Sequence, residues 1–431
     1  MKKRAIVAAI GLALGSQGAL AADASVEQKI EILQQEIEAL KAQLNTSAQP
    51  AAGAPAAQPQ AAAAAAGTGP SLPGHAAGDY WEPRLQQSRT VIGGYGEINY
   101  NNYRDSSKND VLDLKRFILF FGHNFNDWIS LRSELEVEHA FVEGGEDSGE
   151  VAMEQAYLNF HFSDRFNLRT GLQLMPLGFL NETHEPPTYY GVERNEVETR
   201  IIPSTWRELA VGLQGEAVPG LEYNVGVSTA PDASKFGNPA NGFRSMRQSG
   251  GQANANEFAV YGALNYRGLP GLLVGGGVFT GNTGGRKDAA GNSLVGGDAR
   301  LTLWDLHAQY NWQNLQVRAL YARGTLDDAG AISAATASTA PKAFYGWYVE
   351  PAYTVWRKGD MRLTPFARYE RYNTQDEVAA GLVADPKNDE RVLTYGASLY
   401  PTRNVVFKAD YQDFDKDDAK DRFNLGVGYM F

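Results

Sequence analysis

The feature that most limits how this chain can fold is an alternation of apolar residues with small or polar ones, which recurs from residue 90 onward. The last nine residues read FNLGVGYMF, in which aromatic and aliphatic side chains alternate with Asn, Gly, Gly and Met. A β-strand with one apolar face produces this two-residue period. Segments of strand character run over 90–103, 111–123, 127–142, 150–162, 165–175, 207–217, 220–229, 256–267, 271–281, 299–311, 314–325, 342–356, 361–372, 391–400, 404–413 and 421–431.

The connections between these segments alternate between short and long. Short ones include NFN at 124–126 and SD at 163–164, whereas long ones include 176–206 and 230–255. One rim of tight turns and one rim of long loops is typical of outer-membrane barrels, whereas β-sandwiches have Greek-key connections. We therefore predict an all-β fold for residues 90–431, a 16-stranded transmembrane antiparallel β-barrel.

Composition is consistent with a membrane barrel. The mean hydropathy of −0.36 is low, but lipid-facing and lumen-facing residues alternate in a barrel and average out. The formal net charge of −11 argues against a nucleic-acid partner, and the lack of cysteine excludes disulfide and thiol chemistry.

The first 22 residues have the pattern of a secretory signal peptide. Three basic residues precede an apolar stretch over 5–14, and Ala-Leu-Ala at 19–21 offers a cleavage site. The alternative, a membrane anchor, is disfavoured because the apolar stretch is too short to span a bilayer.

A heptad pattern follows over residues 24–46. Its apolar positions are spaced 4, 3, 4, 3 and 4 residues apart, as in a coiled coil, and they are Val26, Ile30, Leu33, Ile37, Leu40 and Leu44. A single amphipathic helix docked on a domain is the alternative. About three heptads are marginally stable alone, so we expect the barrels to hold the helices together in a homotrimer. The segment 111–123 contains RFILFF, apolar in both phases, which predicts a strand that is also buried on its outer side. Residues 47–89 are rich in Ala, Pro, Gln and Gly and are predicted to be a flexible linker.

Sixteen strands enclose a lumen wide enough for a water channel. The longest connection, 176–206, mixes apolar anchors with charged residues, and a loop of this length in a compact domain is usually functional or disordered. We predict that it folds inward and narrows the channel, with a surface-exposed loop as the alternative.

Charged residues on the polar phase of the strands, and within 176–206, are candidates for the pore lining. A row of arginines opposite a row of acids would create a transverse field in a constriction. For each residue alone, the alternative is a solvated lumen charge or an ion pair of small energetic effect. The predicted lining and constriction residues are Arg165, Arg169, Arg194, Arg200, Arg318, Arg368, Glu134, Glu136, Glu138 and Glu193.

The last segment must pair with the first to close a barrel. Tyr429 and Phe431 share its apolar phase, so we expect them to face lipid near the periplasmic rim, where barrels carry an aromatic girdle. A terminal aromatic also resembles the signal that outer-membrane proteins present to the barrel-assembly machinery. We therefore predict that Phe431 and Tyr429 form an assembly signal.

Four stretches of the barrel region carry a family resemblance. They read GGYGEINY, LKRFILFFGHNFNDWISLRSELEVEHAF, LRTGLQLMPLGFLNETHEPP and IPSTWRELAVGLQGE. They resemble the porin family of the phosphate-selective porins O and P, including its relatives with an N-terminal coiled coil. The resemblance covers about residues 90–431 and is most specific over 165–217. It implies trimeric 16-stranded barrels, a third external loop folded into the pore, and arginines and lysines along an anion path. The segment 176–206 contains no lysine, so the lysine part of this pattern does not carry over to it.

These patterns predict an outer-membrane porin, not an enzyme, which forms a water-filled channel for passive diffusion of small hydrophilic solutes, anions among them. The expected location is the bacterial outer membrane, surrounded by its lipid, with the helix 24–46 in the periplasm. No metal-ligand spacing and no phosphate-binding glycine loop is present, so neither a metal nor another cofactor is expected.

Two alternatives remain open. One is a barrel hydrolase, which needs a histidine beside a serine or aspartate near one rim. His123, His139, His161 and His307 lie on or beside separate predicted strands, and none has an obvious partner of that kind. The other is a structural tether that spans the periplasm, and this role can coexist with transport.

Overall fold

The computed structural model describes residues 88–140, 149–295 and 298–431, all of which belong to one compact unit. The predicted signal peptide (1–22), the predicted coiled-coil helix (24–46) and most of the predicted linker lie outside the described residues. Within the described residues, no helix has both the length and the apolar character needed to cross a membrane.

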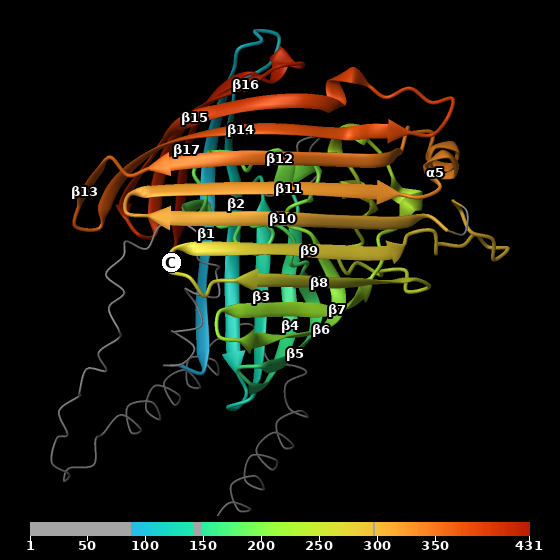
Figure 1. The fold of residues 1–431 in the computed structure, drawn as a ribbon, viewed down its shortest axis with the longest axis horizontal. Helices are drawn as coiled ribbons and strands as arrows, with labels where there is room; N and C mark the ends of the chain where they lie inside the picture. Colours follow the sequence, from blue (N-terminus) through green and yellow to red (C-terminus); the bar gives the residue numbers. More distant parts are fainter. Residues whose placement is uncertain (1–87, 141–148, 296–297) are drawn as a thin grey trace, which may run out of the picture. The chain divides into compact units, whose positions relative to one another are not determined.

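Every predicted segment contributes a strand to one antiparallel sheet (Figure 1). The segment 342–356 is divided, because β12 ends at Tyr353 and the short β13 continues the pairing with β14. β14 is longer than predicted, since its pairing with β12 extends to Val378. The strands are β1 (Thr90–Tyr103), β2 (Val111–Asn124), β3 (Ile129–Glu138), β4 (Val151–Ser163), β5 (Phe166–Leu174), β6 (Arg207–Val218), β7 (Leu221–Thr229), β8 (Phe258–Tyr266), β9 (Leu272–Asn282), β10 (Arg300–Trp312), β11 (Leu315–Leu326), β12 (Pro341–Tyr353), β13 (Trp356–Lys358), β14 (Met361–Val378), β15 (Asp389–Thr402), β16 (Val405–Phe414) and β17 (Arg422–Met430).

The sheet closes on itself as a 16-stranded barrel, with β12 and β13 sharing one position in the wall. β1 pairs with β2 on one side and with β17 on the other, where Tyr95 lies opposite Met430 and Tyr103 opposite Arg422. The remaining strands pair with their neighbours in sequence. Closure leaves no row of unpaired backbone groups, which a hydrocarbon environment would not tolerate. The predicted pairing of the last segment with the first is confirmed.

The two faces of the wall follow the two sequence phases. On β17, the side chains of Phe423 and Leu425 are exposed on the outer face, while Asn424 is fully buried on the inner face. Phe431 shares the outer phase, and its backbone exchanges hydrogen bonds with Gly94 of β1 (N···O 2.9 and 3.1 Å). The last residue of the sequence therefore contributes directly to the seam of the barrel.

Exposed aromatic residues gather along the rim of short turns. Such a girdle marks a membrane–water interface in outer-membrane barrels. Its members flank the turns that join β2 to β3, β4 to β5, β8 to β9, β10 to β11 and β12 to β14, together with the chain end. They are Phe125, Trp128, Phe162, Phe166, Tyr266, Trp312, Tyr353, Trp356 and Phe431.

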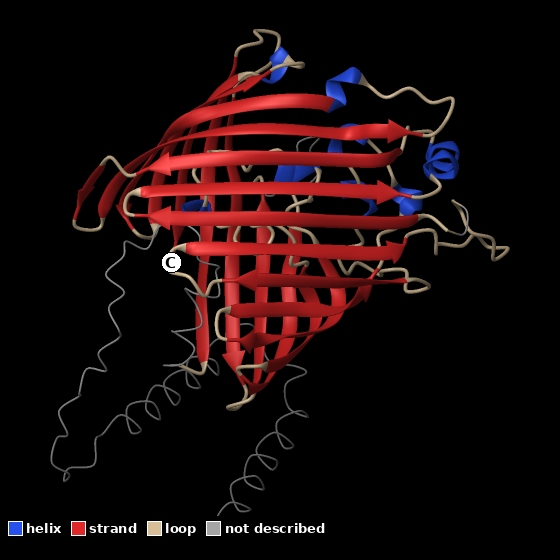
Figure 2. Cartoon of the chain, in the orientation of Figure 1, coloured by secondary structure: helices blue, strands red, loops and turns tan. Residues whose placement is uncertain are grey.

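Helical segments are short and belong to the long connections, at strand ends or within the barrel (Figure 2). They are η1 (Pro186–Thr188), α4 (Val197–Arg200), η2 (Ala233–Lys235), η3 (Pro239–Asn241), η4 (Arg244–Met246), α5 (Ala329–Thr336), η5 (Pro386–Asn388) and η6 (Asp418–Lys420). The first two lie in the connection 176–206, which determines the shape of the lumen.

Candidate functional site: a constriction in the barrel lumen

The connection 176–206, which we call the inward loop, lies inside the barrel. The side chains of Leu177, Tyr190 and Trp206 are fully buried. Short 3₁₀ and α turns (η1 and α4) place successive parts of the loop against different strands of the wall. The predicted inward fold agrees with these contacts, and the alternative of a loop on the outer surface does not.

Glycines on the inner face of the wall make room for the inward loop. A Cβ at Gly428 of β17 would lie 2.2 Å from Cβ of Pro186, and one at Gly346 of β12 would lie 2.9 Å from Cγ1 of Ile201. Real Cβ atoms do not approach other carbons so closely, and packed interiors have little free space to relieve such overlaps. These positions therefore accept the loop because they carry no side chain.

Apolar packing fixes one side of the inward loop. The indole of Trp206 packs against Phe243, from the connection between β7 and β8, and Phe279 of β9, with ring centroids 5.1 and 4.5 Å away. Val197 and Ile201 of the α4 region join the same buried cluster. Burying each such side chain contributes about 1.5–3 kcal/mol. The side of the lumen around β9–β12 is consequently filled by dry packing.

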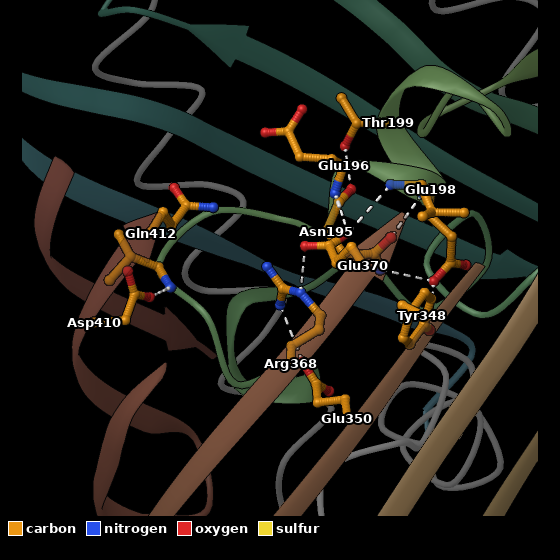
Figure 3. A network of polar contacts seen from close by, with 12 residues as sticks. Asn195, Glu196, Glu198, Thr199, Tyr348, Glu350, Arg368, Glu370, Asp410 and Gln412 are labelled. Atoms are coloured by element: carbon orange, nitrogen blue, oxygen red, sulfur yellow. Dashed lines mark hydrogen bonds and ion pairs between the residues drawn. The ribbon is translucent and has the colours of Figure 1, made fainter. Parts of the chain in front are cut away.

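A polar network connects α4 to the inner face of β12 and β14 (Figure 3). Arg368 Nη1 lies 3.0 Å from Glu350 Oε2, and Arg368 Nε lies 2.7 Å from Glu370 Oε1. The other oxygen of Glu370 accepts a hydrogen bond from the backbone N–H of Glu196 (2.7 Å), just before α4. The hydroxyl of Tyr348 donates to the carboxylate of Glu198 (2.8 Å).

Strands β15 and β16 bind the middle of the loop through its backbone. Asp410 accepts a hydrogen bond from the N–H of Val192 (2.6 Å), and Lys408 Nζ donates to the carbonyl of Gly191 (2.8 Å). Ser398 donates to the carbonyl of Tyr190 (2.8 Å). Buried backbone groups must be paired, and the wall here supplies partners that the loop itself lacks.

A polar cavity of about 270 Å³ lies between the inward loop and the wall around β1, β2 and β17. Its members Glu138, Arg244 and Arg422 come from strand ends or connections at the rim of long loops, so the cavity lies toward that rim. The lining residues are Glu97, Lys115, Arg116, Glu138, His139, Tyr189, Val192, Glu193, Arg194, Glu196, Thr199, Arg200, Ser204, Arg244 and Arg422.

Two of the bases in this lining are neutralised by adjacent acids. Arg116 Nε lies 2.7 Å from Glu97 Oε1. Arg200 forms an ion pair with Glu196 one turn earlier in the loop, and this carboxylate raises the pKa of the Arg200 guanidinium. These pairs contribute local structure rather than net charge.

The remaining bases give the cavity its electrostatic character. Among the residues that the structure describes, no carboxylate oxygen lies within 4.0 Å of a side-chain nitrogen of Lys115, Arg194, Arg244 or Arg422. Burial and then the positive charge of Arg194 lower the pKa of Arg244. Removal of Glu193 from water opposes its ionisation, but Lys115 and Arg422 lower the pKa of this carboxyl to about 2. The cavity therefore contains basic groups without a direct carboxylate partner among the described residues.

Four of the ten predicted lining residues border the polar cavity, and the other six do not. Glu138, Glu193, Arg194 and Arg200 line the cavity. Arg318 and Arg368 face the lumen but are buried, since the loop covers them: Arg318 Nη2 donates to the carbonyl of Thr188 (3.0 Å). Arg318 thus binds the loop directly, whereas Arg368 pairs with Glu350 and Glu370 of the wall, and Glu370 accepts the hydrogen bond from the loop. Neither arginine lines the polar cavity.

Arg165 is also wrongly placed by the sequence prediction. β5 starts at Phe166, so Arg165 lies in the exposed turn after β4 and not on the inner wall. Arg169 does lie on β5, with its guanidinium 4.8 Å from the ring centre of Tyr157. It belongs to a different part of the lumen from Arg194 and Arg200 and does not line the cavity. The four arginines do not form one basic side.

Glu134 and Glu136 face the lumen as the phase predicts, but both are buried. Sequence reasoning missed Lys115, Arg116, Arg244 and Arg422 in the cavity. The polar phase of β17 could have indicated Arg422, but Arg244 belongs to the connection between β7 and β8, where no periodic pattern applies.

No family model matches this chain. An uncharacterized protein of Aquifex aeolicus is 35% identical over 356 residues, which are 79% of this chain and 79% of that protein.

Several solved outer-membrane structures have similar folds. OmpF of Salmonella typhi, in complex with daunomycin, superimposes with a TM-score of 0.54 at 13% identity over 79% of this chain and 97% of its own. A loop-deletion form of OmpT, an outer membrane protein of Vibrio cholerae, has a TM-score of 0.52 at 14% identity over 79% and 99%. The outer membrane channel DcaP of Acinetobacter baumannii has a TM-score of 0.50 at 15% identity over 79% and 97%. At such low identities these likenesses concern the fold, which is that of the 16-stranded outer-membrane porins, and the chain belongs to the same family as the uncharacterized Aquifex aeolicus protein.

Proposed function

We propose that this protein is an outer-membrane porin through which small hydrophilic solutes diffuse passively, with a preference for anions. The observation that carries the proposal is the inward loop, which crosses the lumen of a closed barrel and leaves a polar cavity with basic groups that lack carboxylate partners. The lumen of a 16-stranded wall is wide, and a loop of this kind reduces it to molecular dimensions.

The anion preference rests on the charge balance of the cavity. Its lining contains six basic and four acidic side chains, so the basic groups are in excess by two. The carboxylates of Glu193 and Glu196 keep their charge but are held by neighbouring groups. Glu193 accepts hydrogen bonds from Asn101 (3.1 Å) and Asn99 (3.4 Å), while Glu196 pairs with Arg200. Arg194 and Arg244 remain to attract a passing anion. In a narrow pore of effective dielectric near 20, one such charge changes the ion preference by about 1 kcal/mol or more.

The likeness to the phosphate-selective porins O and P motivates phosphate as one candidate anion. The inward loop contains no lysine, but the cavity includes Lys115 of β2 next to the loop. Comparing chloride, phosphate and a small carboxylate as charge carriers would rank the candidates.

A barrel hydrolase is supported less well. Among the described histidines, the hydrogen-bond partners that could orient a ring include Asp113 for His139 and Asp305 for His307. A serine hydroxyl is not among the hydrogen-bond partners of any described histidine. A triad needs such a nucleophile within reach of its base.

We further propose that the barrels assemble as homotrimers in the outer membrane, with the segment 24–46 as a periplasmic coiled coil that also acts as a tether. Leu119 and Phe121 of β2 are exposed on the outer face while Ile118 is buried inside, so β2 offers an apolar outer surface. One solved OmpT structure of Vibrio cholerae is described as a trimer form.

Single-channel recording in planar bilayers tests the channel and its constriction. Replacing 180–200 with a short flexible linker should raise conductance clearly, provided that heat-modifiable mobility shows a folded barrel. An unchanged conductance in a folded variant would contradict a constricting role for the loop.

A second pair of variants tests the anion preference. The double change Arg194→Ala and Arg244→Ala should move the zero-current potential in a salt gradient toward cations. The matched control is Arg165→Ala with Arg403→Ala, which removes the same charge from exposed turns at the other rim. Equal potentials for the two double variants would refute the assignment of Arg194 and Arg244.

A further inference from the structure

Three potential metal ligands meet inside the barrel, at a place that the channel proposal does not use. They are Glu134 of β3, Glu154 of β4 and His184 of the inward loop. Each offers a ligand atom, and these atoms lie within 4.8 Å of one another. All three side chains are at least 98% buried. Buried carboxylates are costly unless they are paired or bind a cation, so the cluster requires an explanation.

The orientation of the His184 ring leaves one nitrogen available for a metal. Nδ1 lies 3.1 Å from the backbone carbonyl oxygen of Asn181, which can only accept, so Nδ1 carries the proton. In the neutral ring, Nε2 then has a free lone pair. This nitrogen lies 3.4 Å from Oε2 of Glu154, which is long for a hydrogen bond. A carbonyl on the far nitrogen is the arrangement usual for metal-binding histidines.

The separation between these two atoms matches that of two ligands on one ion. Tetrahedral zinc binds histidine nitrogen and carboxylate oxygen at about 2.0–2.2 Å, which places neighbouring ligand atoms about 3.4 Å apart. Among the described residues, neither Nε2 of His184 nor Oε1 of Glu154 has a hydrogen-bond partner. Both carboxylate oxygens of the adjacent Glu185, a fully buried residue, also lack one.

Two side chains that adjoin the cluster orient its carboxylates by hydrogen bonds. Gln155 donates from Nε2 to Glu134 Oε2 (2.8 Å), and the hydroxyl of Tyr95 donates to Glu154 Oε2 (3.3 Å). Such second contacts fix ligand geometry at protein metal sites. In this cluster they hold carboxylates from two strands toward the same imidazole nitrogen.

We propose that Glu134, Glu154 and His184 bind a divalent transition-metal ion of the zinc type, which fastens the inward loop to β3 and β4. One imidazole and two carboxylates suit zinc, whereas calcium and magnesium take larger sets of oxygen ligands. The apolar packing at β9–β12 and the polar contacts from β14–β16, described above, act on other parts of the loop. The ion therefore ties the segment around His184 to β3 and β4, two strands that those contacts do not involve. The proposal is independent of ion selectivity and of channel activity.

Metal binding by the tag-free, full-length protein in detergent is the direct test. After treatment with a chelator and its removal, the wild type should take up about one zinc ion per chain. Cobalt in place of zinc should give the absorption bands of a tetrahedral site. Glu154→Gln and His184→Gln should each weaken zinc binding by at least about tenfold. His161→Gln is the matched control, since that ring lies near the short-turn rim beside Asn167.

Misfolding and metal binding elsewhere must be separated from this result. Heat-modifiable mobility reports folding, and His184→Cys, which restores a zinc ligand, should recover binding that His184→Gln loses. Zinc should raise the melting temperature of the wild type but not of His184→Gln. No uptake by the folded wild type, or equal uptake by His184→Gln and His161→Gln, would overturn the proposal and leave His184 as an imidazolium paired with Glu154. Neither outcome decides whether the barrel conducts, so the proposed function is tested separately by the single-channel recordings.

Discussion

Replacing Arg368 with methionine tests how the inward loop is held in the lumen. The guanidinium lies between Glu350 and Glu370, at 3.0 and 2.7 Å. Glu370 in turn accepts hydrogen bonds from the backbone N–H groups of Glu196 and Val197, where α4 begins. Methionine keeps an unbranched side chain of similar reach but removes the charge. The two carboxylates then face each other without the cation between them.

The expected effect is large because all three charged groups are buried. Removing one member of a buried ion pair typically costs about 3–5 kcal/mol, since the partner stays desolvated and unpaired. Water can reach Glu350 and Glu370 only if the loop moves away from β14. The hydrogen bonds between the strands are not affected. We therefore expect the loop to loosen while the barrel wall stays folded.

The matched control is Arg371→Met on the same strand. Arg371 lies on the outer phase, its Nη2 is 3.4 Å from Asp389 Oδ1, and both side chains are more than a third exposed. Exposed pairs of this kind contribute about 0.2–1 kcal/mol. In planar bilayers, Arg368→Met should give a higher and noisier single-channel conductance, with a lower temperature for the shift in gel mobility. Arg371→Met should behave as the wild type.

Indistinguishable conductance and melting for the two variants would refute this account of the loop. A lower melting temperature with unchanged conductance would show that the ion pairs stabilise the wall without holding the loop in place.

Three other predictions address the packing, the seam and the assembly of the barrel. Gly428→Ala should displace the loop at Pro186 and destabilise the protein by about 1–3 kcal/mol, measured by thermal unfolding, whereas Gly262→Ala, whose new Cβ would lie 3.5 Å from Val225, should be nearly neutral; equal stability of the two would contradict the close contact. Phe431→Ser should reduce the amount of heat-modifiable barrel in the outer membrane without changing secretion, and unchanged levels would rule out Phe431 as an assembly signal. Deleting 24–46 should leave trimers that melt at a lower temperature, and a full-length protein that migrates as a monomer in mild detergent would exclude this mode of assembly.

The wall of the barrel could be predicted closely because each strand carries its own signal. The alternation in 404–413 and 421–431 corresponds to β16 and β17 within a residue or so at each end. Turns such as Asp164–Arg165 are too short for anything but a hairpin between adjacent strands. The prediction placed Arg165 on a strand because it started the segment one residue too early. Alternation of side chains does not define where a strand begins or ends.

The contents of the lumen could be predicted only in part. The phase placed Arg318 and Arg368 on the inner face correctly, but phase does not reveal which inner positions the loop covers. Both are buried: Arg318 binds the loop directly, and Arg368 acts on it through Glu370. The length and composition of 176–206 predicted its inward fold, whereas its contact points on the wall depend on glycines such as Gly346 and Gly428.

The sequence by itself determined the architecture of the wall. In every strand of a closed antiparallel barrel, side chains face outward and inward in alternation, so the local pattern of apolar and polar residues is enough to define each strand. The tertiary structure alone decided which charges face the cavity, and it alone brought Glu134, Glu154 and His184 together. These arrangements depend on contacts between distant positions, such as the hydrogen bond from Val192 to Asp410 across 218 residues of sequence. No local period encodes such contacts, since they follow from the shape that the loop adopts once the wall has closed around it.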